Sequence, residues 1–229
     1  MGGLNPLDRP VWASLTGAHA HLALGEGKAR RYRPDVNRFV AGADDEPATL
    51  AAMAALVEPG DEVLVIQAEL IPDLPGLALV FRRAAVQMVH DGAGADSDDR
   101  EIVPLGELEA HEMLALATLT KPGPFRLRTP RMGEFFGVKR QGRLAAMAGQ
   151  RMHPPGYVEL SGVCTHPDFR GEGLATRLST HVTRAIIARG ETPFLHAWAD
   201  NLGAIALYEK LGYRHRRAMN VALFERAKG

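Results

Sequence analysis

The stretch VCTHPDFRGEGLATRLSTHVTRAIIAR, residues 163–189, decides the fold that we predict for this chain. A run of β-branched and apolar residues, 157–165, leads into it and is typical of a strand. Pro167 ends the strand, because proline has no N–H to give to a ladder. After Gly173 the apolar residues recur every four positions, which predicts a helix. They are Leu174, Leu178, Val182 and Ile186.

The turn RGEG, residues 170–173, has the chemistry of an anion-binding site. The first N–H groups of a helix have no partner within the helix, and the helix dipole adds partial positive charge. Gly171 and Gly173 have no Cβ atoms, so a phosphate can approach the backbone. Arg170 adds a planar set of donors that suits phosphate oxygens. A tight turn that binds nothing has the same local pattern, so this turn alone leaves both interpretations open.

Two longer motifs favour a ligand. The first, V-x-T-x-P-x-F-R-G-x-G-x-A over residues 163–175, is neither a nucleotide-hydrolase phosphate loop nor a dinucleotide fingerprint. It resembles the R/Q-x-x-G-x-G/A signature of the GNAT (N-acetyltransferase) superfamily, which cradles the pyrophosphate of acetyl-CoA. The second, NLGAIALYEKLGY over residues 201–213, resembles the N-x-x-A-x-x-L-Y-x-x-x-G-[FY] segment of that superfamily. With both motifs in the expected order, the chain is identified as a GNAT member.

Composition fits an ordinary globular protein in water. Of the 229 residues, 46% are apolar and 24% are charged, which suffices for a sizeable core. Cys164 is the single cysteine, so no internal disulfide can form and a cytoplasmic location is expected. We expect Cys164 to be a small buried hydrophobic residue. The start, MGGLNPLDRP, does not resemble a signal peptide, and no membrane partner is expected.

The net charge of zero argues against a general nucleic-acid binder. The two halves differ, however. Residues 1–110 hold 9 Lys and Arg against 18 Asp and Glu, a net charge of −9, and residues 111–229 have the opposite balance, +9. A basic half suits an anionic cofactor such as CoA, and an acidic half suits docking onto it or attracting a cationic substrate. Two solvated faces of opposite sign explain the numbers equally well.

The order of elements predicts an α/β or α+β fold with a mixed sheet. The resemblance implies that residues 101–229 form a GNAT N-acetyltransferase domain. Residues 1–100 are predicted to form a smaller α/β domain. Their character resembles a predicted-acetyltransferase subfamily related to glycine N-acyltransferase, in which the N-terminal half is a degenerate GNAT-like copy.

Individual elements follow from periodicity and from turn residues. A basic stretch, 28–33, is interpreted as a solvated strand or loop edge. Residues 91–99, rich in Gly and Asp, are interpreted as a turn or linker, because they lack the spacing of a calcium loop. Helices are predicted at 11–24, 48–57, 101–118 and 202–211, and strands at 62–67, 77–89, 134–139, 144–152, 193–199 and 213–224.

The resemblance implies transfer of an acetyl group from acetyl-CoA, as cosubstrate, directly to a primary amine. Backbone groups of the strand before the turn would bind the pantetheine arm, and the turn would bind the pyrophosphate. Glu172 is an unexpected carboxylate in such a loop, and we expect its side chain to point to water. The expected cofactor-binding residues are Val163, Cys164, Thr165, Arg170, Gly171, Glu172, Gly173, Leu174, Ala175, Thr176, Asn201 and Ala204.

Two residues are expected to be catalytic. Tyr208 matches the family position whose hydroxyl protonates the CoA thiolate, although helix packing explains a tyrosine there too. Glu159 is the candidate general base, because strand alternation places it on one face with Val163 and Thr165. A surface glutamate without a role is an equal alternative.

His196 on the following strand competes with Glu159 as the base, and Glu134 is a more distant candidate. The histidines lack metal-ligand spacing, so no metal is expected.

Three functions stay open from sequence. The leading one is an acetyl-CoA-dependent N-acetyltransferase that acts on a small-molecule or protein amine. The second is a catalytically idle acyl-CoA-binding module whose N-terminal half binds a partner. The third is an N-acyltransferase that uses a longer acyl-CoA. Either a monomer or a homodimer is consistent with the sequence.

Overall fold

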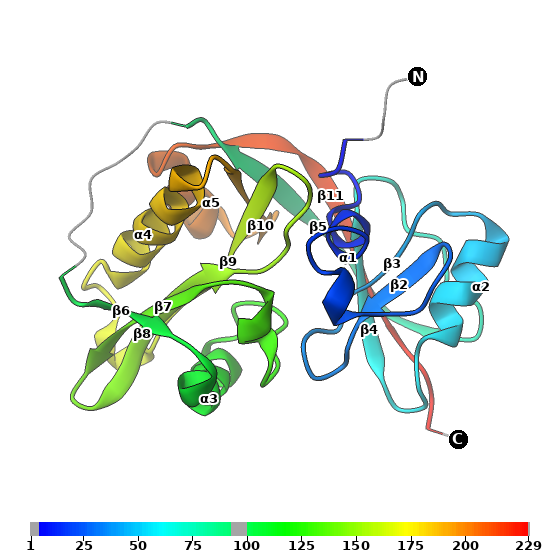
Figure 1. The fold of residues 1–229 in the computed structure, drawn as a ribbon, viewed down its shortest axis with the longest axis horizontal. Coiled ribbons are helices and arrows are strands. Elements are labelled where there is room, and N and C mark those ends of the chain that lie inside the picture. Colours follow the sequence, from blue (N-terminus) through cyan, green and yellow to red (C-terminus); the bar gives the residue numbers. More distant parts are fainter. Residues whose placement is uncertain (1–4, 93–99, 229) are drawn as a thin grey trace.

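The computed structural model describes residues 5–92 and 100–228, so most of the turn or linker expected at 91–99 lies outside the described residues. A mixed eight-stranded sheet organises the molecule (Figure 1). Its β9 and β10 strands are parallel, and its other neighbouring strands are antiparallel. The mixed α/β fold predicted from the sequence is therefore confirmed. The strand order is β4 (Glu62–Gln67), β11 (Tyr213–Glu225), β5 (Ala78–His90), β10 (Thr192–Trp198), β9 (Tyr157–Thr165), β8 (Arg143–Gln150), β7 (Phe135–Arg140) and β6 (Ile102–Leu105).

Helices cover both faces of the β8–β9 part of the sheet. Helix α4 (Leu174–Ala188) packs on one face, and its four predicted apolar residues are all at most 2% exposed. Helix α3 (Ala110–Thr120) packs on the other face, where Cys164 is buried as expected. Helix α5 (Leu202–Lys210) lies against the start of β11. This packing fixes β9 between two helices.

The N-terminal residues form a second layer beside the sheet. Their elements are α1 (Pro10–Leu15), a 3-10 turn (Ala20–Leu22), β1 (Ala23–Leu24), β2 (Ala29–Tyr32), β3 (Val40–Gly42) and α2 (Pro47–Ala55). Strands β1 to β3 form a small antiparallel sheet, and a bridge from Phe39 to Leu64 joins it to β4.

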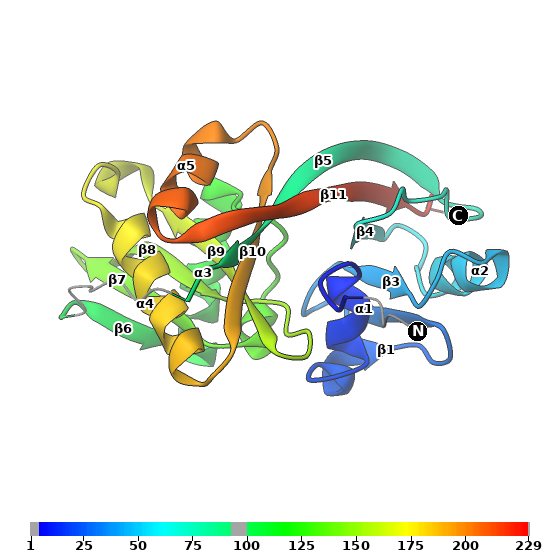
Figure 2. The same cartoon turned by 90° about the horizontal axis from the view of Figure 1, so that it is seen from above.

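A long ribbon of β5 and β11 connects the two halves (Figure 2). Strands β4 and β5 precede residue 100 in sequence, yet they share one sheet with strands that follow it. The division into domains at residue 100 stays a prediction, as does the origin of the N-terminal half as a degenerate copy.

The bounds of two predicted helices were wrong. The helix predicted at 11–24 ends at Leu15, just before Gly17, and the Thr16 hydroxyl donates back to the Trp12 carbonyl. The helix predicted at 101–118 begins at Ala110, because Pro104 interrupts it and instead suits the edge strand β6.

The interpretation of the basic stretch at 28–33 as a solvated edge was wrong in part, because one of its arginines is buried. Arg31 is only 2% exposed and donates to the Leu56 carbonyl and to Asp61.

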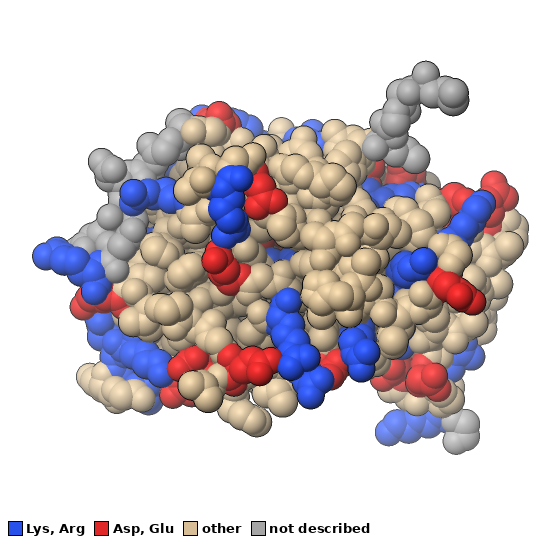
Figure 3. Space-filling model, viewed as in Figure 1, with Lys and Arg blue, Asp and Glu red and all other residues tan. Residues whose placement is uncertain are grey.

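Surface charge does not divide into two faces in the view of Figure 3. Acidic and basic side chains are interspersed over both halves of this face. The net charges of −9 and +9 therefore do not form two single-sign surfaces here. Of the helices in the described ranges, none combines the length and the apolar character needed to cross a membrane.

Candidate active site

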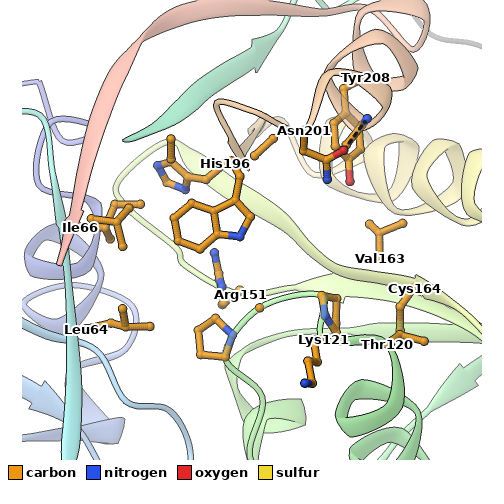
Figure 4. A pocket seen from close by; sticks show the side chains of 18 of the residues that line it. Leu64, Ile66, Thr120, Lys121, Arg151, Val163, Cys164, His196, Asn201 and Tyr208 are labelled. Carbon is orange, nitrogen blue, oxygen red and sulfur yellow. Dashed lines mark hydrogen bonds between the residues drawn. The ribbon is translucent and has the colours of Figure 1, made fainter. Parts of the chain in front are cut away.

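The separation of β9 and β10 creates the site. These parallel strands pair at three positions only, the last being Phe194 with Glu159. Beyond that pair they diverge, and a pocket of about 360 Å³ opens between them (Figure 4). One end of the pocket is formed by β9 and α5, and the other reaches the N-terminal half at Phe39, Leu64 and Ile66.

A bulge at Gly162 breaks the alternation of side chains along β9. Gly162 has a φ of +65°, and three residues of β9 advance there against two of β8. Val163 consequently packs on the α4 side together with Leu160, whereas Glu159 points to the opposite face. The prediction that Glu159 shares a face with Val163 and Thr165 is wrong, because it assumed unbroken alternation.

The end of the pocket beside the glycine turn, which we name the cofactor end, gathers residues from both sequence motifs. Seven of the residues expected to bind the cofactor or to be catalytic line the pocket. They are Val163, Cys164, Thr165, Arg170, Asn201, Ala204 and Tyr208.

The glycine turn continues from Arg170 into α4. Gly171 and Gly173 have φ values of +86° and +73°, and no atom lies within 4 Å of the place that a Cβ would take at either position. Residues 171–176, which we expected to bind the cofactor, form this turn and the first residues of α4. They are not among the residues that line the pocket. The open space and the left-handed backbone suit a bulky anion against the main chain.

Charged side chains at the turn have different surroundings. Arg170 is exposed, and within the described residues its guanidinium has no hydrogen-bond or ion-pair partner. Glu172 lies 4.0 Å from Arg140, so its carboxylate is directed at a cation rather than only at water. Arg170 is thus available to an anion at the turn.

Tyr208 projects from α5 into the cofactor end. Its ring stacks edge-to-face with that of Tyr213 at 5.9 Å, and burial raises the pKa of Tyr208 to about 12. The phenol therefore keeps its proton at neutral pH. The Asn201 side chain accepts a hydrogen bond from the Ala204 N–H and caps α5 (Figure 4).

Glu159 lies beneath the pocket and does not line it. Its side chain is fully buried, accepts two hydrogen bonds from Arg151 at 2.8 and 2.7 Å, and lies 2.7 Å from His196 Nδ1. Burial alone raises the pKa of Glu159, but Arg151 and His196 outweigh it and lower the pKa to about 2. This carboxylate is a weak proton acceptor and has no direct access to a substrate.

His196 lines the pocket, and both of its ring nitrogens have partners. Gln87 Oε1 accepts from Arg216 at 2.7 Å, which orients the Gln87 amide so that its nitrogen faces His196 Nε2 at 3.0 Å. Nε2 must therefore accept, and Nδ1 carries the proton that is donated to Glu159. Arg216 is held in turn by Asp8 at 2.8 Å. These partners fix the tautomer of the ring, with the proton on Nδ1.

Glu134 lies outside the pocket. It is exposed on the loop before β7, where it pairs with Arg189 and accepts a hydrogen bond from Gln150. None of the three base candidates thus offers a free proton-accepting atom to the pocket. Among the described residues, no group of three or more His, Cys, Asp or Glu side chains is arranged to hold a metal ion.

The opposite end of the pocket, which we name the acceptor end, was missed from the sequence. Its walls are Phe39, Leu64, Ile66 and Trp198, and Arg151 and His196 supply its polar groups (Figure 4). These residues come from four separate segments and form no motif. The strand pattern of β4 predicts that Leu64 and Ile66 are buried, but it carries no signal that they face a pocket.

Comparison with known proteins agrees with this geometry. Residues 135–221 match a family model described as FR47-like protein. A putative GNAT acetyltransferase from Novosphingobium aromaticivorans, known from a crystal structure, is 45% identical and covers 98% of this chain and 100% of its own, with a TM-score of 0.91. The chain belongs to the GNAT family. This GNAT protein therefore shares its whole architecture, including the N-terminal half, with a solved family member.

Two further relatives are more distant or shorter. A GCN5-related N-acetyltransferase from Kribbella flavida is 18% identical with a TM-score of 0.61, covering 94% of this chain and 95% of its own, and shows the fold alone. An acetyltransferase from Pectobacterium atrosepticum is 46% identical over 50 residues. That match spans 21% of this chain and 35% of the relative, about a third of its length.

Proposed function

We propose that this GNAT protein is an N-acetyltransferase that moves an acetyl group from acetyl-CoA directly to a primary amine. One observation carries the proposal: the divergence of β9 and β10 brings Val163, Arg170 and Tyr208 around a single pocket. The unpartnered Arg170 and the open glycine turn fit a pyrophosphate group. A cytoplasmic location, expected from the single cysteine, belongs to the same proposal.

Each residue has a separate task in the proposed reaction. Acetyl-CoA supplies an activated acetyl group, and a C–N bond to the amine replaces its C–S bond. The Val163 N–H donates to the acetyl carbonyl oxygen as negative charge develops there. The Tyr208 hydroxyl gives its proton to the departing thiolate and regains one from solvent. The amine loses a proton to water, so the products are an amide and the free thiol.

The surroundings assist the loss of that proton. An ammonium group is disfavoured near other cations, and the charged side chains that line the pocket are Lys121, Arg151 and Arg170. The acceptor amine therefore reacts in its neutral form without a dedicated carboxylate base. Glu159 holds the His196 ring and Arg151 in place and is a positioning residue.

Other parts of the sequence prediction are also carried forward as proposals. The relation to glycine N-acyltransferase would permit a longer acyl group, and measured rates with acyl-CoA thioesters of increasing length test it. An idle acyl-CoA-binding module is the second candidate function. A protonated Tyr208 in the pocket favours the enzyme, because a binding module needs no acid there.

The experiment is acetyl transfer measured as release of free thiol from acetyl-CoA in the presence of a panel of primary amines. We expect Tyr208→Phe to lower kcat by about 100-fold or more without weakening acetyl-CoA binding, because general acid catalysis contributes a factor of about 100 to 10,000. Tyr213→Phe is the matched control. Its hydroxyl contacts Thr183 in the core and not the pocket. Equal rates in the two variants would contradict the acid role of Tyr208. Binding of acetyl-CoA without transfer to any amine would contradict the enzyme.

A further inference from the structure

All the Lys, Arg, Asp and Glu residues that line the pocket in the described part of the chain are positively charged. In the part of the chain that the structure describes, the charged residues that line the pocket are Lys121, Arg151 and Arg170, and no Asp or Glu is among them. Arg170 belongs to the cofactor end, beside the glycine turn. The proposed reaction uses Lys121 and Arg151 only as nearby positive charges and gives them no group of the substrate to bind. A substrate that fits them carries a negative group.

Arg151 presents a rigidly held hydrogen-bond donor to the pocket. Its side chain is only 9% exposed, and its Nε and Nη2 atoms are fixed by the two hydrogen bonds to Glu159. Among residues 5–92 and 100–228, the remaining nitrogen, Nη1, has no hydrogen-bond partner, although its neighbours leave it room. A Cβ atom added at Gly123 would lie 3.5 Å from Arg151 Nη1. Because glycine has no side chain, the space beside this nitrogen is open. A buried guanidinium with idle N–H donors has a strong preference for an anionic oxygen.

Lys121 adds a second cation nearby. It ends α3 in a left-handed conformation with a φ of +52°, which turns the chain into the loop Pro122-Gly123-Pro124 along the pocket. Its ammonium group is exposed and forms no ion pair with the described residues. Both cations therefore border the same loop, one beneath it and one at its start.

The rest of the acceptor end is apolar. Phe39, Leu64 and Ile66 are 2%, 7% and 5% exposed and present their side chains to the pocket from the N-terminal half. Trp198 closes the wall from β10, and Arg83 stacks on its ring at 4.1 Å. An apolar group of the substrate gains free energy by covering these surfaces.

We infer that the acceptor is an amine that also carries a carboxylate and an apolar side chain: a free α-amino acid of the leucine or phenylalanine type. Its carboxylate would accept from Arg151 Nη1, with Lys121 at the start of the same loop as a second positive charge, and its side chain would pack on Phe39, Leu64 and Ile66. This inference rests on the proposed function and names the substrate class of the same pocket. Polyamines are disfavoured, because their second ammonium group brings a further cation to a cationic wall.

Binding of product analogues tests the inference without relying on turnover. Isothermal titration would compare N-acetyl-leucine with N-acetyl-leucinamide, each added to the wild-type protein saturated with CoA. The two ligands differ in the carboxylate alone. We expect the acid to bind about tenfold or more tightly than the amide, the factor typical of a hydrogen bond to a charged group. Equal binding, or tighter binding of the amide, would overturn the inference.

Two variants assign the effect to its residues. Arg151→Lys keeps a cation for Glu159 but removes the second guanidinium nitrogen, and Lys121→Met removes the other charge. Each should reduce the preference for the acid over the amide while leaving the affinity for the amide and for CoA unchanged. Lys139→Met is the matched control, since Lys139 pairs with Glu112 outside the pocket. An unchanged preference in both pocket variants would also overturn the inference.

The proposed function fails separately from this inference. If CoA does not bind to the wild-type protein, the proposed function is wrong, and the substrate class is wrong with it. If CoA binds, and acetyl transfer to cadaverine exceeds transfer to leucine, the enzyme stands and the amino-acid acceptor is wrong. If acetyl transfer to leucine exceeds transfer to leucinamide and to cadaverine, the result supports the proposed function and the amino-acid acceptor.

Discussion

The two ends of the pocket are built in different ways. The cofactor end comes from residues 163–208, a nearly continuous stretch, and relies on glycine backbone and helix ends. The acceptor end is assembled from segments as far apart as Phe39 and Val221 and relies on buried charged and apolar side chains. The first kind of site depends on local conformation, and the second depends on the whole sheet. Substitutions should therefore damage the two ends in different ways.

The largest expected effect is on the acceptor end. Glu159→Gln removes the charge that compensates Arg151 in the core, and breaking such a buried pair costs about 3–5 kcal/mol of the free energy of unfolding. Glu62→Gln, in a partly exposed pair with Arg38, is the matched control and should cost less than about 1 kcal/mol. Urea unfolding measures both. A similar small loss in the two variants would show that the acceptor end does not depend on its buried charges.

The same carboxylate gives a pH dependence with a definite sign. The pKa of Glu159 falls from its ordinary 4.5 to about 2 on folding, so the folded state binds this proton less readily than the unfolded state. Its contribution to stability is present above about pH 4.5 and is lost as the pH falls toward 2. The difference in unfolding free energy between wild type and Glu159→Gln should therefore be constant from pH 7 to 5 and shrink below that.

A smaller effect is expected at the cofactor end. Gly173→Ala places a Cβ in a left-handed conformation at the start of α4, where it blocks an anion from the backbone. We expect acetyl-CoA affinity to fall by roughly 100-fold, as for two lost hydrogen bonds to a charged group. Isothermal titration measures this affinity.

The same helix offers the matched control for that substitution. Gly190 follows the end of α4 with a φ of +78°, and Gly190→Ala carries the same backbone strain far from the turn. Both variants should lose similar stability, about 1–2 kcal/mol for an alanine in this conformation. Equal affinities for acetyl-CoA in both would remove the turn from the cofactor site.

The smallest expected effect concerns the link between the N-terminal half and the pocket. Gln87→Glu keeps the shape of the side chain but replaces its N–H donor to His196 with an acceptor. A carboxylate oxygen in place of the N–H that donates to the Leu7 carbonyl should cost about 1–2 kcal/mol of unfolding free energy, because two buried acceptors then face each other. ¹⁵N NMR should find the His196 proton on Nδ1 in the wild type and a protonated Nε2, facing the new acceptor, in the variant. The other eight histidines of the chain are internal controls, and an unchanged His196 signal would contradict the assigned tautomer.

Sequence predicted the elements that local rules determine. The strand 62–67 matches β4, the strand 157–165 matches β9, and a helix follows Gly173 as expected. The candidate cofactor residues depend on the same local motifs, and seven of the fourteen site residues named from the sequence, Tyr208 included, line one pocket.

The sequence did not predict what depends on tertiary context. Alternation along β9 suggested a face for Glu159, but one glycine with a positive φ reverses the alternation beyond it. Arg151 could not be recognised, because its significance comes from Glu159 eight residues later and from a loop thirty residues earlier. The apolar wall at Phe39 likewise depends on how the N-terminal half packs.

The position of β11 in the sheet has a consequence for how the protein is made. This strand lies between β4 and β5, although about 120 residues separate the end of β5 from its own start. Ribosomes add about 5–20 residues per second, so β4 and β5 wait roughly ten seconds with the edges that β11 will fill still exposed. Such late, non-local pairing also slows folding. The acceptor wall is therefore among the last parts of the molecule to form, and the nascent chain depends on other contacts until then.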